Sequence, residues 1–249
     1  MPFTLAHAAV LVPCRRLPSR WLSLTGLAFG AMAPDLEYFV RLSATAGVGH
    51  TPAGVLLFDL PAALLLAWLF HGLVRRPLLR HLPAPLDRLL APAAEAAWRT
   101  SSWRALVLLA GSAVLGSLSH LAWDASTHPG GAVVVVWPLL SSPLPLLPWR
   151  IPVYKLLQHG STLLGLTVLA RWIYTQWVVR GGEAAAGSVS AGGKARYWAI
   201  VFLGAAALAG YRIATTGGLD LRQYGAYIVS LLSGSLLGVV VASALFRNE

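Results

Sequence analysis

The sequence is poor in charged residues and has one cysteine. Charged residues make up 11% of the 249 residues and hydrophobic residues 57%. Soluble domains carry about a quarter charged residues, so this scarcity excludes an ordinary soluble fold and indicates a membrane protein with several spans. The lone Cys14 excludes an internal disulfide and a zinc site built from several thiolates.

The charge that is present is mainly positive, with 19 basic and 9 acidic residues. The basic residues form short clusters between apolar runs and do not gather in one patch. This distribution argues against nucleic acid as a partner, and it follows the positive-inside rule for membrane loops. The expected partner is therefore the lipid bilayer.

Six apolar runs predict an all-α, polytopic membrane protein with about six spanning helices and additional short re-entrant or interfacial segments. The runs cover residues 21–40, 55–74, 105–123, 156–179, 197–214 and 226–246. Residues 3–13 form an apolar helix too short to cross a core of about 30 Å. Pro34 is expected to break or kink the first run. Residues 85–98 are expected to lie on the membrane surface as an amphipathic helix, and the proline-rich residues 131–150 to form a re-entrant or surface lid.

The sequence divides into a membrane domain (1–180) that carries the candidate metal site, a flexible cytoplasmic loop (181–196) and a C-terminal helical pair of the same membrane domain (197–249). The loop assignment rests on its glycine, serine and alanine content. Six spans place both termini on one side. If that side is cytoplasmic, fourteen of the nineteen basic residues lie inside and five outside, as the positive-inside rule requires. The protein is thus predicted to be a multi-pass protein of the cytoplasmic (inner) membrane with cytoplasmic termini.

Three potential metal ligands recur every four residues where the third run ends: His120, Asp124 and His128. On a helix, residues four apart share a face with about 6 Å of rise, so His120 and Asp124 can bind one ion. His128 lies roughly 12 Å from His120 along the axis, too far for direct co-ligation unless the chain folds back at Pro129. A carboxylate in an apolar segment costs about 2.5–3.5 kcal/mol, which a cation would offset.

The predicted topology brings further ligands to the same outer level, namely Asp35, His50 and His159. Imidazoles and carboxylates together suit zinc first, with manganese or iron as alternatives. Each residue also has a simpler interpretation. His120 and Asp124 could form a hydrogen-bonded pair without metal, His50 could be a solvated loop residue, and His159 could bond to a neighbouring helix.

Four segments together resemble an uncharacterised bacterial membrane family, domain of unknown function 4184. They are Met1–Ala9, Gly30–Phe39, His120–His128 and Ile151–Ser161. The resemblance extends to about residue 180, and the family implies no activity. Its layout is similar to that of membrane-bound metal-dependent hydrolases, which implies that His7, Asp35, His50, His120 and Asp124 are the site positions. A strict six-span arrangement leaves His7 on the inner side, and it joins the others only if residues 3–33 form a re-entrant pair of short helices.

The leading functional hypothesis is a metal-dependent hydrolase at the outer membrane interface that acts on a lipid or phosphate ester. Its divalent ion would lower the pKa of a bound water toward about 7. Asp35 and Glu37 are the candidate catalytic carboxylates, with Glu37 as a general base. The alternatives are a cation or proton transporter that uses the same residues, and a structural membrane protein without catalysis.

Overall fold

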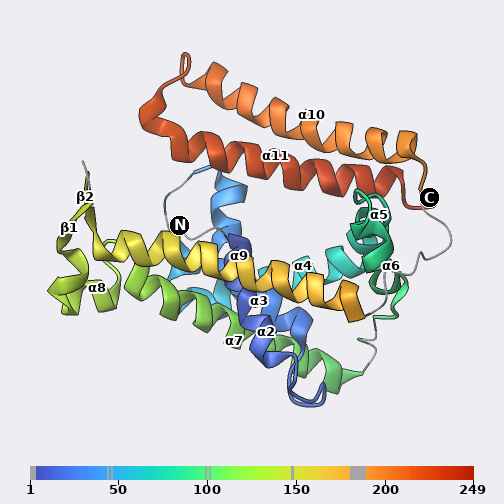
Figure 1. Cartoon of the computed structure of the whole chain (residues 1–249), viewed down its shortest axis with the longest axis horizontal. Coiled ribbons are helices and arrows are strands. Elements are labelled where there is room, and N and C mark those ends of the chain that lie inside the picture. Colours follow the sequence, from blue (N-terminus) through green and yellow to red (C-terminus); the bar gives the residue numbers. More distant parts are fainter. Residues whose placement is uncertain are drawn as a thin grey trace. The chain divides into compact units, whose positions relative to one another are not determined.

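The computed structural model describes residues 4–43, 45, 47–98, 100, 102–146, 149–179 and 189–249. Most of it is helical, and each apolar run of the sequence falls largely in helical structure (Figure 1), as expected for the all-α class. The long helices are α3 (Leu24–Arg41), α4 (Leu60–Leu69), α7 (Trp103–Thr127), α9 (Val153–Val179), α10 (Ala191–Thr215) and α11 (Tyr224–Leu245). Two π-helical segments, Val55–Asp59 and Phe70–Val74, flank α4, and α5 (Arg75–Arg80) continues from the second.

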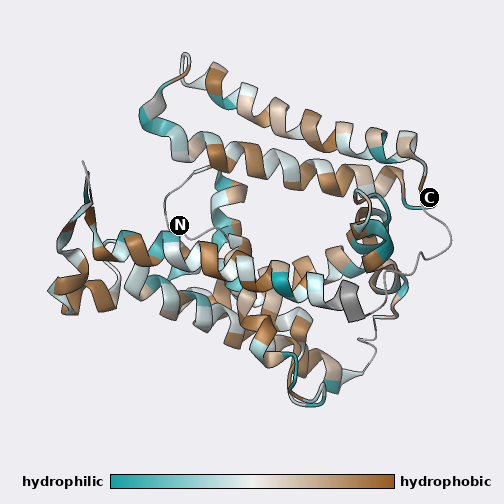
Figure 2. Cartoon of the chain, in the orientation of Figure 1, coloured by the Kyte–Doolittle hydropathy of each residue, from teal (hydrophilic) through white to brown (hydrophobic). Residues whose placement is uncertain are grey.

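Four helical stretches among the described residues are long and apolar enough to cross a membrane, which identifies a membrane protein. They are Val55–Arg80, Trp103–Val136, Ala191–Thr215 and Tyr224–Leu245, and Figure 2 shows the hydrophobic bands along α10 and α11. The six spans expected from the sequence are not confirmed. The helix α3 is outside this set because it carries Asp35, Glu37 and Arg41 within 18 residues, and α9 is outside it as well.

The chain forms two compact units. The first contains Met1–Asp35, Gly47–Leu64 and Thr100–Thr175. Within it α3 and α7 pack with their backbones in contact, since a Cβ at Gly30 would collide with the carbonyl of Ala113 and a Cβ at Gly116 with that of Leu27. Small residues allow this approach between membrane helices. The close packing places the Ala31 carbonyl of α3 beside His120 of α7.

The N-terminal segment forms the short helix that the sequence predicts: α1 (Thr4–His7), a 3-10 turn (Ala8–Val10) and α2 (Leu11–Cys14). Of the predicted break or kink at Pro34, the break is wrong, because α3 runs from Leu24 to Arg41 with Pro34 inside it, and the kink stays a prediction. A proline removes one intrahelical hydrogen bond and clashes with the preceding turn. Membrane helices tolerate it because neighbouring helices satisfy the groups that it leaves unbonded.

The proline-rich residues 131–150 form no long helix of their own among the described positions, and only Ala132–Val136 belongs to a candidate span, at the end of Trp103–Val136. They fold into α8 (Ala132–Val136), a 3-10 turn (Pro138–Ser141) and the start of a hairpin of β1 (Pro143–Leu146) with β2 (Trp149–Pro152). The two strands are antiparallel, and Leu144 pairs with Ile151. A role of this segment as a lid stays a prediction.

The second unit contains Leu36–Ala46, Leu65–Arg99 and Gln176–Glu249. Here α10 and α11 pack around buried Tyr197, Val201 and Ala242, and Gly204 and Gly234 let their backbones meet. Within the predicted amphipathic segment 85–98 the structure has the helix α6 (Leu86–Glu95). Its place on the membrane surface stays a prediction. Of the predicted loop at 181–196, residues 181–188 lie outside the described residues, and α10 already begins at Ala191.

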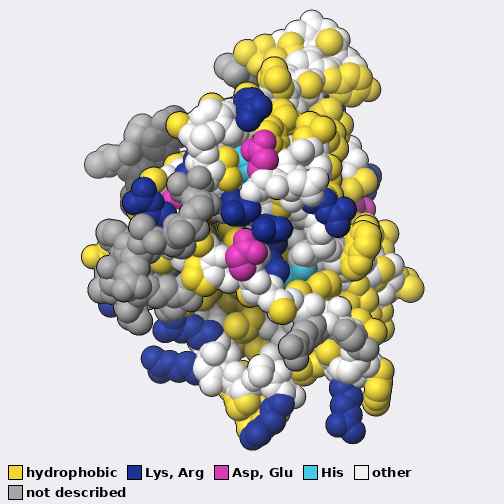
Figure 3. Space-filling model, turned by 90° about the vertical axis from the view of Figure 1, so that its right-hand side faces the viewer, with side chains coloured by type: hydrophobic (Ala, Val, Ile, Leu, Met, Phe, Trp, Pro, Cys, Tyr) yellow, Lys and Arg dark blue, Asp and Glu magenta, His cyan; other side chains and the backbone are white. Residues whose placement is uncertain are grey.

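Several basic side chains of the second unit are paired with carboxylates. Lys194 pairs with the buried Asp87, and Arg76 with Glu95 at 3.2 Å. Figure 3 views the molecule from the side on which α5 and α6 lie, and it shows Lys and Arg side chains gathered around acidic ones. The hydrogen bonds that Asp87 accepts from Lys194 and from the Arg88 backbone outweigh the opposing effect of burial, so the pKa of Asp87 is lowered from its usual value.

Candidate metal centre

Five of the seven predicted ligands meet inside the first unit. They come from four segments: His7 from α1, Asp35 from α3, His50 from a 3-10 turn (Val48–His50), and His120 and Asp124 from α7. Among the described residues they form two overlapping groups, His7–Asp35–His120 and His50–His120–Asp124. Within each group the ligand atoms all lie within 4.8 Å of one another. The side chains are between 0% and 13% exposed.

His120 is the residue shared by both groups, and its protonation is fixed by its neighbour. Its Nδ1 lies 2.8 Å from the carbonyl oxygen of Ala31. A carbonyl oxygen can only accept, so Nδ1 carries the proton and donates it. In a neutral ring Nε2 then presents a lone pair. That atom is buried and has no hydrogen-bond partner among the described residues.

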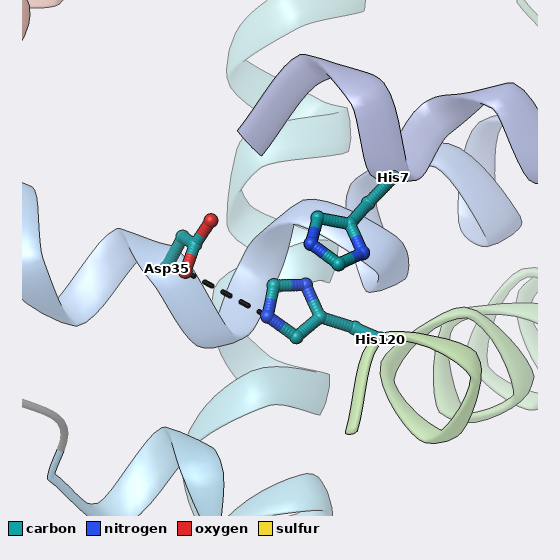
Figure 4. A group of neighbouring side chains, drawn as sticks. All are labelled: His7, Asp35 and His120. Carbon is teal, nitrogen blue, oxygen red and sulfur yellow. Dashed lines mark ion pairs between the residues drawn. The ribbon is translucent and has the colours of Figure 1, made fainter. Parts of the chain in front are cut away.

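Two carboxylates converge on this lone pair. Oδ1 of Asp35 lies 3.6 Å from Nε2 of His120, and Oδ2 of Asp124 lies 3.3 Å from it. Figure 4 shows the Asp35 carboxylate directed at the His120 ring. The distances exceed those of hydrogen bonds, which have modes near 2.7–3.0 Å. Buried acceptors that face one another without a proton repel, and a cation between them would remove that repulsion.

His50 contributes a second imidazole to this arrangement. Its Nε2 lies 3.5 Å from Oδ1 of Asp35 and 3.7 Å from Oδ2 of Asp124. Together with the two distances from His120, four edges between two imidazole nitrogens and two carboxylate oxygens measure 3.3–3.7 Å. Ligands placed tetrahedrally about 2.1 Å from a zinc ion are about 3.4 Å apart. These four nitrogen–oxygen distances therefore match the spacing between neighbouring ligands of a divalent ion.

His7 lies at the edge of this set. Its ring stacks on that of His120 with centroids 3.8 Å apart (Figure 4), and its Nε2 lies 3.7 Å from Oδ1 of Asp124. Burial, and then the neighbouring His120, lower the pKa of His7 to about 4. His7 is therefore neutral at pH 7, the form in which imidazole can bind a metal. The short helix α1 thus brings His7 to the other ligands. A strict six-span arrangement had placed His7 on the inner side, away from them.

Thr4 supports Asp35 and was not singled out from the sequence. Its Oγ1 donates a hydrogen bond of 2.6 Å to Oδ2 of Asp35, which leaves Oδ1 for the imidazoles. The residue stands three positions before His7, so on a helix both lie on one face. This spacing is the sequence signal that could have identified Thr4. Partners of this kind orient metal ligands and are needed for full affinity.

His128 and His159 are in neither group. Nδ1 of His128 lies 3.4 Å from Oδ1 of Asp124, and its Nε2 contacts the amide of Gln158 at 3.1 Å. His159 is exposed, whereas the adjacent Gln158 is 1% exposed. The side chain of α9 that faces the cluster is therefore Gln158. The sequence had indicated His159 instead, because that residue is ionisable.

Glu37 is also in neither group. It belongs to the second unit, and its Oε1 accepts a hydrogen bond of 3.0 Å from Nη1 of Arg41. The reason is the continuity of α3 through Pro34. Residues two apart on an unbroken helix point to different sides, so Asp35 and Glu37 cannot serve one site together.

The chain belongs to the family described as domain of unknown function (DUF4184), whose model matches residues 1–244. The match extends past residue 180, where the recognisable motifs end, and it includes α10 and most of α11. No curated protein and no solved structure matches the chain. The description of the family assigns no activity, so the function has to be argued from the cluster itself.

Proposed function

We propose that the protein is a membrane-embedded, metal-dependent hydrolase whose divalent ion is held by Asp35, His50, His120 and Asp124. The supporting observation is that each of two carboxylate oxygens, one from Asp35 and one from Asp124, lies 3.3–3.7 Å from Nε2 of both His50 and His120. Two nitrogen and two oxygen ligands favour zinc. Manganese and iron, which accept the same ligand types, are the alternatives.

A bound divalent ion of this kind lowers the pKa of water toward about 7 and so supplies a nucleophile for ester hydrolysis at neutral pH. Hydrolysis adds one water across the ester bond, yields an acid and an alcohol, and needs no other reactant. The carboxylates of Asp35 and Asp124 would balance the charge of the ion, and Thr4 and Ala31 would hold Asp35 and His120 in place. The ion pair of Glu37 with Arg41 leaves Glu37 without a part in this scheme.

Two features favour a hydrolase over a structural cluster. Structural pairs of histidine and aspartate are expected at hydrogen-bond distances, and the five contacts of His7, His50 and His120 with the carboxylates are longer. In addition, His7 lines a cavity of about 340 Å³ in the same unit. A substrate in that cavity would lie next to the ion.

The test is the metal content of the full-length protein, purified in detergent and measured by mass spectrometry after exposure to zinc, manganese or iron(II). We expect about one ion per chain, lost in His50→Ala, His120→Ala and Asp124→Ala. His159→Ala is the matched control, because His159 is exposed on α9, and it should keep the metal. A wild-type protein that binds none of the three ions would contradict the proposal.

Activity separates the hydrolase from a transporter. The loaded protein should hydrolyse p-nitrophenyl acetate, p-nitrophenyl phosphate or bis(p-nitrophenyl) phosphate, and His120→Ala should not. In liposomes it should produce neither zinc uptake nor proton flux. Flux without hydrolysis would favour a transporter that uses the same ligands.

We further propose six spans in a bacterial inner membrane with cytoplasmic termini. The asymmetry of the basic residues supports this orientation. On a Cys14→Ser background, a membrane-impermeant maleimide added to intact spheroplasts should label Arg222→Cys and spare Arg16→Cys, both of which replace exposed residues. The reverse pattern would invert the topology.

A further inference from the structure

A cavity in the first unit borders the metal cluster without being part of it. Its walls come from the N-terminal helix, α7 and α9, and its volume is about 340 Å³. Ligand sites typically measure about 300–1,000 Å³, so this cavity suits one narrow group and not a large molecule. His7 lines it, and Nε2 of the same residue faces Asp124 at 3.7 Å.

The walls of the cavity offer little to a polar ligand. Its lining is predominantly apolar, with Ala6, Val10, Leu164 and Val168 among the wall residues. Apart from His7, the polar side chains of the wall are already engaged: Nε1 of Trp123 donates to Oγ of Ser161 at 3.1 Å. The hydroxyl of Ser119 likewise donates to the carbonyl of Gly116 at 2.6 Å. The occupant should therefore be a hydrocarbon group.

The cavity is lined by side chains that also lie on the outer surface of the helices. Leu164 is 64% exposed and Trp123 47% exposed, although both line the cavity. Trp123 belongs to α7, within a candidate membrane span. Exposed apolar side chains of a spanning helix face the acyl chains of the bilayer. Entry from the hydrocarbon region would favour esters that carry an alkyl chain.

We propose that the substrate is an amphiphile, one alkyl chain of which lies in the cavity between the N-terminal helix, α7 and α9, with its ester head beside His7. This inference rests on the proposed hydrolase function. The cavity supplies the apolar end, and the cluster supplies the polar end one side chain away. The alkyl chain of the substrate would hold the ester at the ion, because burial of each CH₂ group contributes favourable free energy to binding.

The experiment uses the full-length, zinc-loaded protein in nanodiscs and a probe whose binding does not require turnover. The probe is a dodecyl phosphate that carries a diazirine at the end of its chain, and its anionic head suits a cation-containing site. After illumination, peptide mass spectrometry should place the adducts on the walls of the cavity. Dodecyl phosphate should compete, and inorganic phosphate at equal concentration should not.

Two variants on α9 form a matched pair. Leu164→Trp with Val168→Trp fills the cavity from one wall, and labelling there should fall about tenfold, as expected when two or more methylene groups lose their apolar contacts. Leu163→Trp is the control, since Leu163 is 70% exposed and does not line the cavity, and it should label like the wild type. If the filled variant does not fold, wild-type competition by dodecyl but not butyl phosphate tests the same point.

Three results would overturn the inference. The first is labelling that the filled variant does not reduce, and the second is a spread of adducts over lipid-facing helices. The third is equal labelling by a diazirine alkane that lacks the phosphate head, because this would indicate ordinary contact with lipid. Metal analysis of the same samples separates the two proposals. Bound metal without cavity labelling refutes the alkyl-chain site alone, whereas cavity labelling without bound metal refutes the hydrolase.

Discussion

The side-chain nitrogen of Gln158 lies 3.1 Å from Nε2 of His128, and this contact determines how His128 faces the cluster. Nζ of Lys155 donates to Oε1 of Gln158 at 2.9 Å, which fixes the orientation of the amide. The amide N–H therefore donates to Nε2 of His128, and the proton of that ring is on Nδ1. Nδ1 lies 3.4 Å from Oδ1 of Asp124.

Replacement of Gln158 should change both the tautomer of His128 and the metal affinity. Gln158→Glu keeps the shape but replaces the donor by an acceptor, so the His128 proton should move to Nε2. Nδ1 of His128 would then present a lone pair to the proposed ligand Asp124 in place of a proton, and loss of a partner that orients a ligand costs about 10–100-fold in metal affinity. The ¹⁵N shifts of the His128 ring report the tautomer, and competition with a chelator reports the affinity. An unchanged tautomer would show that Gln158 only packs; His159→Ala is the neighbouring control.

Thr4→Val should weaken metal binding without a large loss of stability. The substitution keeps the shape of the side chain and removes the hydroxyl that donates to Oδ2 of Asp35 at 2.6 Å. Asp35 then loses the bond that directs Oδ1 to the imidazoles, and we expect about a 10–100-fold higher dissociation constant. Thr4→Ser retains the hydroxyl and should restore most of the affinity. Equal metal affinities of the two variants would contradict a role of Thr4 in metal binding.

Gly30→Ala should destabilise the protein, because the added Cβ would collide with the carbonyl of Ala113. Overpacking of this kind costs about 1–3 kcal/mol, and separation of α3 from α7 would also move the Ala31 carbonyl away from His120. Gly111→Ala is the matched control on α7, since a Cβ there meets nothing within 4 Å, and it should be neutral or stabilising. Thermal unfolding of the zinc-loaded and metal-free proteins measures both effects.

The pair of Asp87 and Lys194 should contribute stability that depends on pH. The pKa of Asp87 is lowered in the folded state, so its contribution is complete above the unfolded value of 3.8 and is lost as the pH falls through the lower folded pKa. In the Asp87→Asn variant, the measured free energy of unfolding should depend less on pH in that acidic range.

At neutral pH, Lys194→Ala should lower the free energy of unfolding more than removal of both charges does, because it leaves the buried carboxylate of Asp87 unpaired. Breaking a buried pair in this way costs about 3–5 kcal/mol, whereas apolar replacement of both partners is often neutral. The double variant Asp87→Leu with Lys194→Leu should therefore recover stability. A double variant less stable than Lys194→Ala would contradict this.

The helical architecture could be predicted from the sequence because it follows from local rules. An apolar run in lipid must satisfy its own backbone, so each run becomes a helix. The spacing of His120 and Asp124 similarly guarantees a shared face. The number of spans does not follow from these rules, since α3 combines a helical pattern with charges that a spanning segment rarely carries.

Tertiary contacts decided which polar residues meet. His7 and His50 reach His120 across long stretches of chain, at distances in sequence where periodicity carries no information. Local pattern also could not choose between Gln158 and His159. The helix α9 is apolar on most sides, so no polar face marks which of the two adjacent side chains turns inward.

The amino-acid sequence by itself determined that this chain is a helical membrane protein of a recognisable family, and that one helix carries an imidazole and a carboxylate on one face. The tertiary structure alone decided that α1, α3 and the turn at His50 complete the set, and that Gln158 supports it. The physical reason is that helix geometry fixes relations within about one turn. Contacts between helices depend instead on where glycines such as Gly30 and Gly116 allow two backbones to touch.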